Sequence, residues 1–468
     1  MLGRVLLILG ITVGWRLAYG QYDKVAALGS DSTLTPIGGP ASSPPLATSG
    51  YDLPDLRPTG KINDQLPRWL QFGLDERLRF ESVPGFKTGA GDSYVLNRFR
   101  FGMIVQQVRW LKAVAQVQDA RSFLQAGPAG PPNNVRWDLK LAYAQIGDLE
   151  TQPFSLTVGR QLIDYNSTII GNSEWRNQAR SYDGVVANVR VDGFRAAVFA
   201  ASIVNPMLDG ISHHQDGNNI YGIYGWMTRV IPKSSIEPFV LRRVAPKVAV
   251  EEGSGRTGRL DENAYGFRIR GTELANFDYR YELVLERGAA GANQIEAWAT
   301  TAGAGYRLKA VPGTPRLFAG YDYASGDRNP ADRLRGTFDT MYPTAHDRLG
   351  ITDQFGWQNI VVWRGGATFF PHRRWSVTGQ YVNLWLASAR DGVYNSSGGL
   401  IVADTSGRSG RHIGEEFDVY TWYEVNRQVH VGAGLGHLAS GEFLGKVARG
   451  AYSYPYFSIE MLDGKRVR

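Results

Sequence analysis

The sequence predicts an all-β protein, an antiparallel transmembrane β-barrel of about 18 strands with both termini in the periplasm. Segments in which apolar and polar residues alternate fill the chain from about residue 70 to its end. The connections between these segments alternate between short and long, and the chain begins with an export-like segment. A barrel in lipid has an apolar outer face, a polar inner face and loops of unequal length at its two ends, so these observations favour it over a soluble exported protein.

Residues 1–20 are predicted to be a secretory signal peptide. Arg4 supplies the positive charge, residues 5–13 form a short apolar core, and Ala18-Tyr19-Gly20 has the pattern of a cleavage site. The mature chain is therefore expected to begin at Gln21. A membrane anchor is the alternative, but the apolar core is far shorter than the roughly 20 residues that a spanning helix needs.

Residues 21–68 are predicted to form a flexible periplasmic segment, and residues 69–468 the barrel. The first of these stretches is rich in proline, glycine and serine and has no periodic apolar pattern. The sequence leaves open whether it plugs the barrel from below.

The first strand shows the alternating pattern best. Leu78 and Phe80 fall on one face, whereas Arg77 and Arg79 fall on the other. The candidate strands begin near Leu70, Asn97, Leu111, Trp137, Phe154, Asp183, Phe194, Ile220, Ile236, Ala264, Phe277, Gln294, Arg316, Asn359, Trp375, Glu416, Gln428 and Tyr452. An even number of strands returns both ends of the chain to the periplasm.

The lengths of the connections support this assignment. Short turns are expected at residues 147–153, 191–193, 231–235, 271–276, 371–374 and 426–428. Long connections are expected at residues 82–96, 119–136, 161–182, 204–218, 243–262, 325–356 and 388–415. The connection at residues 288–293 is an exception, because it is short where a long one is expected.

The composition excludes several classes of function. The chain has no cysteine, which rules out disulfides, thiolate metal sites and cysteine nucleophiles. Its formal charge of +7 is modest for 468 residues, and no basic run is typical of nucleic-acid binding. Aromatic residues make up 12% of the chain, which favours a barrel with aromatic girdles.

Arginines concentrate on the predicted inner face of several strands. A guanidinium stays charged and grips a carboxylate with two parallel hydrogen bonds, so arginines around a pore favour anions. The alternative is that they pair with acidic residues and brace the wall, for which Asp75, Glu76, Asp278, Glu282 and Glu286 are available. The strand arginines of this set are Arg77, Arg79, Arg98, Arg100, Arg160, Arg268, Arg270, Arg280 and Arg364.

The connection around residues 159–184 is dense in arginine, asparagine and glutamine. It contains Gly159-Arg160-Gln161, Glu174-Trp175-Arg176-Asn177 and Arg180-Ser181-Tyr182-Asp183-Gly184. A long loop of this composition can fold into the pore as a constriction or lie as an ordered loop on the surface.

No catalytic or metal site is predicted. His213, His214 and His346 fall in predicted loops without a spaced set of further ligands, so no metal or other cofactor is expected. Glu416 and Asp418 imitate a glycosidase pair only superficially, and no nucleophile elbow, P-loop or dinucleotide motif is present. The chain is therefore not expected to be an enzyme.

Several motifs in a shared order resemble the alginate-export family of bacterial outer-membrane barrels. They are Arg98-Phe99-Arg100, Gln116-Val117-Gln118-Asp119-Ala120-Arg121, the motifs of residues 159–184, Tyr321-Asp322-Tyr323-Ala324-Ser325-Gly326-Asp327, Phe338-Asp339, Tyr342-Pro343, Trp357-Gln358-Asn359-Ile360 and Ile413-Gly414-Glu415-Glu416-Phe417-Asp418. The resemblance implies a monomeric barrel of about 18 strands with an arginine-rich constriction that passes an acidic uronate polysaccharide. It also implies that Arg98, Arg100, Arg160, Arg176 and Arg180 contact the anion.

The sequence and the resemblance together predict a passive outer-membrane channel for anionic solutes or acidic polysaccharide. Its expected partners are outer-membrane lipid, the anion itself and periplasmic secretion proteins, with no nucleic acid. A general anion porin and a surface receptor or adhesin that uses the long loops are the alternatives. Fold alone does not choose between them, since one barrel hosts many selectivities.

Overall fold

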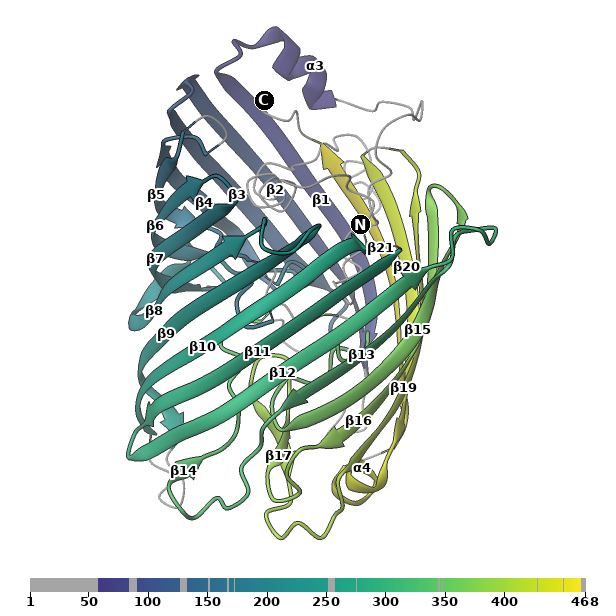
Figure 1. Ribbon diagram of the computed structural model, residues 1–468. Helices are drawn as coiled ribbons and strands as arrows, with labels where there is room; N and C mark the ends of the chain where they lie inside the picture. Colours follow the sequence, from purple (N-terminus) through teal and green to yellow (C-terminus); the bar gives the residue numbers. More distant parts are fainter. Residues whose placement is uncertain are drawn as a thin grey trace.

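The computed structural model is a barrel whose strands tilt across its axis (Figure 1). It describes residues 58–83, 91–126, 133–149, 152–165, 168–171, 173–250, 257–274, 276–343, 346, 348–426, 428–448 and 450–463. The predicted signal peptide and most of the predicted periplasmic segment, residues 1–57, lie outside the described residues. Within the described part of the chain, no helix is long and apolar enough to cross a membrane.

The wall is built from long strands that follow one another along the chain. Their bounds are β1 Leu70–Val83, β2 Asp92–Val108, β3 Leu111–Phe123, β4 Val135–Ile146, β5 Phe154–Gln161, β6 Tyr182–Val191, β7 Phe194–Asn205, β8 His213–Met227, β9 Ser234–Val250, β10 Thr257–Leu274, β11 Phe277–Ala290, β12 Asn293–Arg307, β13 Arg316–Ala324, β15 Ile360–His372, β16 Trp375–Leu386, β19 His412–Glu424, β20 Val429–Ser440 and β21 Tyr452–Asp463. The smaller elements are α3 Pro58–Gln65, β14 Leu334–Arg335, β17 Gly392–Tyr394, β18 Leu400–Ala403 and α4 Glu442–Val447.

Antiparallel pairing closes the sheet on itself. Each wall strand pairs with the next, and β1 pairs with both β2 and β21, so the described wall leaves no open edge. The barrel has 18 strands, as the sequence predicted. Three short strands lie outside this pattern: β14 pairs in parallel with β12, and β17 and β18 form a separate two-stranded sheet.

The two ends of the barrel differ in their connections. One end carries short turns, and it also carries α3 and the end of β21 (Figure 1). The other end carries the long connections, together with β14, β17 and α4. The predicted exception is confirmed, because β11 ends at Ala290 and β12 begins at Asn293.

Four predicted long connections are wrong in their extent, because the flanking strands are longer than predicted. β2 begins at Asp92 and β3 ends at Phe123, β7 ends at Asn205 and β8 begins at His213, and β9 ends at Val250 and β10 begins at Thr257. His213 and His214 therefore lie in β8 and not in a loop. Polar residues near the rim hid these extensions, because a strand that rises above the membrane no longer needs an apolar outer face.

The distribution of buried residues is that of a barrel with an apolar exterior. On β1, Arg77 and Arg79 are each 2% exposed, whereas Leu78 and Phe80 are 38% and 39% exposed. Exposed rings at the short-turn end form one aromatic belt, which includes Trp69, Trp110, Phe154, Phe194, Phe277 and Trp375. The charged face of the strand thus points inward, as the alternating pattern predicted.

Candidate functional site

The connection between β5 and β6, the 162–181 loop, lies inside the barrel and is held there by wall arginines. Arg77 donates hydrogen bonds to the carbonyl oxygens of Glu174, Trp175 and Arg176 at 2.9, 3.0 and 3.0 Å. Arg79 donates to the Trp175 carbonyl at 2.6 Å, and its guanidinium carbon lies 3.9 Å from the centre of the indole ring. The inward face of β1 therefore fixes the backbone of the loop.

The carboxylate of Glu174 joins the same loop to β2. Arg98 and Arg100 donate to it at 3.0 and 2.9 Å, and both also lie near Asp75, at 3.3 and 3.5 Å. Burial alone would raise the pKa of Glu174, but Arg100, Arg98 and Lys140 outweigh it and lower the pKa to about 2. Glu174 is thus a buried anion at any physiological pH.

Amide and ammonium groups hold the rest of this loop. Asn177 donates to the carbonyls of Asn97, Arg121 and Asn133 at 3.1, 3.2 and 3.0 Å. The ammonium group of Lys140 donates to the carbonyls of Ala179 and Arg180. Every one of these contacts joins distant parts of the chain, which explains why sequence reasoning missed Lys140.

The connection between β13 and β15, the 325–359 loop, also enters the barrel and locks onto the first loop. Ile170 and Tyr342 form a parallel bridge, in which Gly171 donates to the Tyr342 carbonyl at 2.8 Å. The ring of His346 stacks on that of Trp175 at 3.7 Å between centroids, and His346 contacts the Asp353 carboxylate at 2.7 Å. Two of the long loops therefore pack together in the lumen.

The two loops cover an apolar part of the inner wall. Phe199, Tyr224, Phe239, Leu241 and Val284 are buried there in one cluster. The loop residues in this cluster are Ile163, Tyr165, Ile169, Ile170, Phe338, Met341, Tyr342, Leu349, Phe355 and Trp357. The interior thus combines the arginines of β1 and β2 with an apolar cluster on β7 to β11, and the sequence did not predict that cluster.

Arg176 and Arg180 differ from the wall arginines in their partners. Arg176 donates to the Ser397 hydroxyl at 2.7 Å, in the connection between β16 and β19, and Arg180 donates to the Pro343 carbonyl at 2.6 Å. Neither forms an ion pair within 4 Å in the described part of the chain. Burial, reinforced by Arg180, lowers the pKa of Arg176 to about 10, so Arg176 stays charged at neutral pH. Burial also lowers the pKa of Arg180.

Four of the other predicted arginines are paired with a carboxylate, whereas Arg280 on β11 forms no ion pair within 4 Å among the described residues. Arg160 grips Asp183 at 2.7 and 2.9 Å, and Arg364 lies 3.5 Å from Asp322. Arg268 and Arg270 share Glu237. The structure therefore gathers Arg77, Arg79, Arg98, Arg100, Arg176 and Arg180 around the 162–181 loop and places the remaining four as braces elsewhere on the wall.

Comparison with known proteins agrees with this architecture. The alginate export family model matches residues 68–454. No curated protein matches the chain.

Solved structures of similar fold share little sequence with the chain. OccAB4 of Acinetobacter baumannii is 12% identical, with a TM-score of 0.54 over 85% of this chain and 99% of that one. OpdQ of Pseudomonas aeruginosa is 10% identical, with a TM-score of 0.54 over 84% and 97%. OccK2 of Pseudomonas aeruginosa, solved in complex with glucuronate, is 10% identical, with a TM-score of 0.53 over 84% and 97%.

Proposed function

We propose that this chain, which belongs to the alginate export family, passively conducts anionic solutes or acidic, uronate-type polysaccharide through a basic lumen. The protein is a channel of the bacterial outer membrane. We assign its short-turn end to the periplasm and its long-loop end to the outside, following the general rule for such barrels.

One observation carries the proposal: arginines gather where the 162–181 loop crosses the lumen. Arg77 donates to backbone carbonyls, and Arg176 and Arg180 donate to a hydroxyl and to carbonyls. A carbonyl or hydroxyl satisfies a guanidinium without cancelling its charge. The positive potential of Arg176 and Arg180 therefore remains available to a passing carboxylate.

The mechanism is electrostatic. Fixed guanidinium groups replace the counter-ions of a carboxylate and lower its barrier to entry, while many weak contacts let a chain of carboxylates slide. Charges near water are screened over about 8 Å at physiological salt, so selectivity is expected to weaken as salt rises. Arg176 and Arg180 are the residues that we assign to direct contact with the anion.

The test is single-channel recording of the refolded full chain in planar bilayers under a KCl gradient. The wild type is expected to prefer chloride, and the R176Q/R180Q double variant to lose most of that preference. A unit charge 4 Å from an ion in water contributes about 1 kcal/mol, so each substitution is expected to change the anion-to-cation permeability ratio roughly fivefold. R287Q is the control, because Arg287 is half exposed and paired with Glu296 on the outer wall.

Adding an oligouronate separates the outcomes. Block of an anion-selective current supports an acidic-glycan channel, and unchanged reversal potentials in R176Q/R180Q would contradict the arginine mechanism. The second candidate is a porin for small uronates, which the interlocked loops in the lumen and the glucuronate complex of OccK2 favour. In that case monomeric uronate permeates, whereas longer oligomers neither block nor pass.

A further inference from the structure

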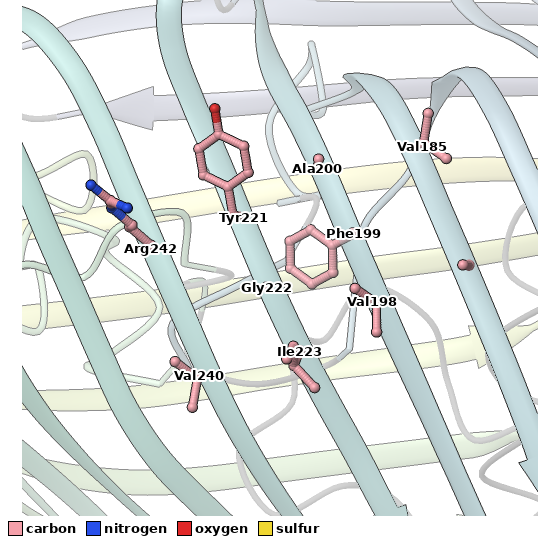
Figure 2. A pocket seen from close by; sticks show the side chains of 10 residues that line it. Val185, Val198, Phe199, Ala200, Tyr221, Gly222, Ile223, Val240 and Arg242 are labelled. Atoms are coloured by element: carbon pink, nitrogen blue, oxygen red, sulfur yellow. The ribbon is translucent and has the colours of Figure 1, made fainter.

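A trough lies on the outer face of the barrel wall (Figure 2). Its volume is about 510 Å³, and it crosses four neighbouring strands, β6 to β9. Most of its lining is apolar and faces outward, including Val185, Val198, Ile223 and Val240. Because the protein spans the outer membrane, an apolar trough at this place faces lipid.

The strand register explains the hollow. One outward row runs through Val185, Ala200, Tyr221 and Arg242. Neighbouring strands lie about 4.8 Å apart, so a small residue such as Ala200 between larger neighbours leaves a depression in the wall. The sequence therefore builds the trough by placing alanine at the outward positions Ala187 and Ala200.

The trough ends at a basic group. Arg242 donates to the Asp261 carboxylate at 2.9 and 2.8 Å, and Arg259 lies 3.5 Å from the same carboxylate. The side chains of Arg242 and Arg259 are 51% and 69% exposed. Two guanidinium groups share one carboxylate, so the cluster keeps a surplus positive charge on the outer surface.

The end of the trough at Arg242 lies at the level where the outer wall changes from apolar to polar. Beyond Arg242 the same row continues through Asn263, Arg287 and Glu296. The next row toward the short-turn end continues from Val240 through Tyr265, Leu285 and Trp298. Aromatic residues at this position mark the boundary of the hydrocarbon, so Arg242 lies at the depth of the head groups and the trough extends from there into the acyl chains.

We propose that this trough binds one lipid with a phosphate-bearing head group in the leaflet at the long-loop end. An acyl chain lies along Val198, Ile223 and Val240, and the phosphate contacts Arg242 and Arg259. Arginine suits a phosphate because its planar fork donates two parallel hydrogen bonds to neighbouring oxygens. Asp261 competes with the lipid for the same donors. Removing the charge of Asp261 is therefore expected to strengthen lipid binding, whereas removing the charge of Arg242 is expected to weaken it.

The test is native mass spectrometry of the full chain in detergent with added dioleoyl phosphatidylglycerol. A basic residue near a membrane surface contributes about 1 kcal/mol to anionic lipid binding, so R242Q is expected to weaken retention of the lipid roughly fivefold. D261N removes the competing carboxylate and is expected to strengthen retention by a similar factor. R287Q, in the same row but outside the trough, is expected to change nothing.

A second pair of variants tests the apolar part. Ala200→Phe fills the trough and is expected to reduce lipid retention several-fold, whereas Val419→Phe adds the same ring on β19, outside the trough. Heat-modifiable migration in gels shows that each variant is folded. Equal retention of phosphatidylglycerol and phosphatidylcholine, unaffected by R242Q, D261N and Ala200→Phe, would mean nonspecific lipid contact and overturn the proposal.

Discussion

Replacing Glu174 with glutamine removes the one carboxylate that fixes the 162–181 loop to β2. Its side chain lies between Arg98 and Arg100, at 3.0 and 2.9 Å, and is buried. Glutamine has the same shape but no charge, and its amide group turns a donor toward donors. We expect the loop to leave its position in the lumen far more often in E174Q than in the wild type.

The magnitude follows from the pKa. A carboxyl group whose pKa falls from 4.5 to about 2 gains about 1.36 kcal/mol per pKa unit when it ionises in the folded protein, which is about 3 kcal/mol here. Breaking a buried ion pair by removing one partner costs a similar 3–5 kcal/mol or so. A loss of about 3 kcal/mol from the free energy that holds the loop closed raises the open population of the loop roughly 150-fold.

Limited trypsin digestion measures that population, because Arg176 and Arg180 are cleavage sites within the loop. When closing is faster than cleavage, the rate of digestion follows the equilibrium population of the open form. E174Q is therefore expected to be cut at these sites about a hundred times faster than the wild type. The control is E442Q, in which an exposed ion pair with Lys446 is lost and no change is expected.

Cleavage of E174Q at the wild-type rate, in a barrel that still shows heat-modifiable migration, would refute this reasoning. It would mean that the hydrogen bonds from Arg77 and Asn177 to the backbone hold the loop without help from the ion pair. Loss of the folded barrel itself would place Glu174 in barrel stability, and the conservative E174D would then distinguish charge from shape.

Three further predictions use the same structure. The pKa of Glu174 is lower in the folded protein than that of an ordinary carboxyl group, so its ionisation stabilises the folded state; this contribution is complete above about pH 5 and falls as the pH drops from 4.5 toward 2. Open-channel current noise is therefore expected to rise by pH 3 and to stay constant between pH 6 and 8. His346→Phe keeps the ring stacked on Trp175, whereas His346→Ala loses about 1 kcal/mol of ring contact, so trypsin is expected to cut the alanine variant several times faster than the phenylalanine variant. Gly159→Ala is expected to cost about 1–3 kcal/mol and to lower the temperature at which the barrel unfolds, because Gly159 has φ of +118° and an added Cβ would lie 2.3 Å from the Ala142 carbonyl; Gly445→Ala, with open space around it, is the control.

The strands could be predicted from the sequence because their pattern is local. A period of two, with apolar residues outward and charged residues inward, places Arg77, Leu78, Arg79 and Phe80 without any knowledge of their neighbours. Connection lengths then fix the two ends of the barrel. The sequence predicted the start of β8 near Ile220, seven residues after its observed start at His213, because the first residues of the strand rise above the apolar belt and carry no alternating pattern.

The contents of the lumen could not be predicted in the same way. The composition of the 162–181 loop left an infolded and a surface position equally open, and contacts with residues far away in the chain decide between them. Arg77 meets Glu174 across 97 positions, and Arg348 of the second loop meets Thr168 across 180. No sequence pattern marks which carbonyl an arginine will bind, so the sequence left bracing and pore lining open for each arginine, and the contacts in the fold decide between them.

The number of arginines in a lumen is therefore a poor measure of its potential, because their partners decide how much charge remains. Arg160 grips one carboxylate, so its field is largely cancelled at short range, whereas Arg268 and Arg270 share a single carboxylate that cancels their combined field only in part. Arg176 and Arg180 donate to neutral oxygens, and neither forms an ion pair within 4 Å among the described residues, so no carboxylate at that range cancels their charge. Loop anchoring and anion attraction are thus compatible in the same residue only when the anchor is a carbonyl or hydroxyl. The pore field should accordingly concentrate around the 162–181 loop, where R176Q/R180Q changes selectivity, whereas substitutions at paired arginines such as Arg268 change stability first.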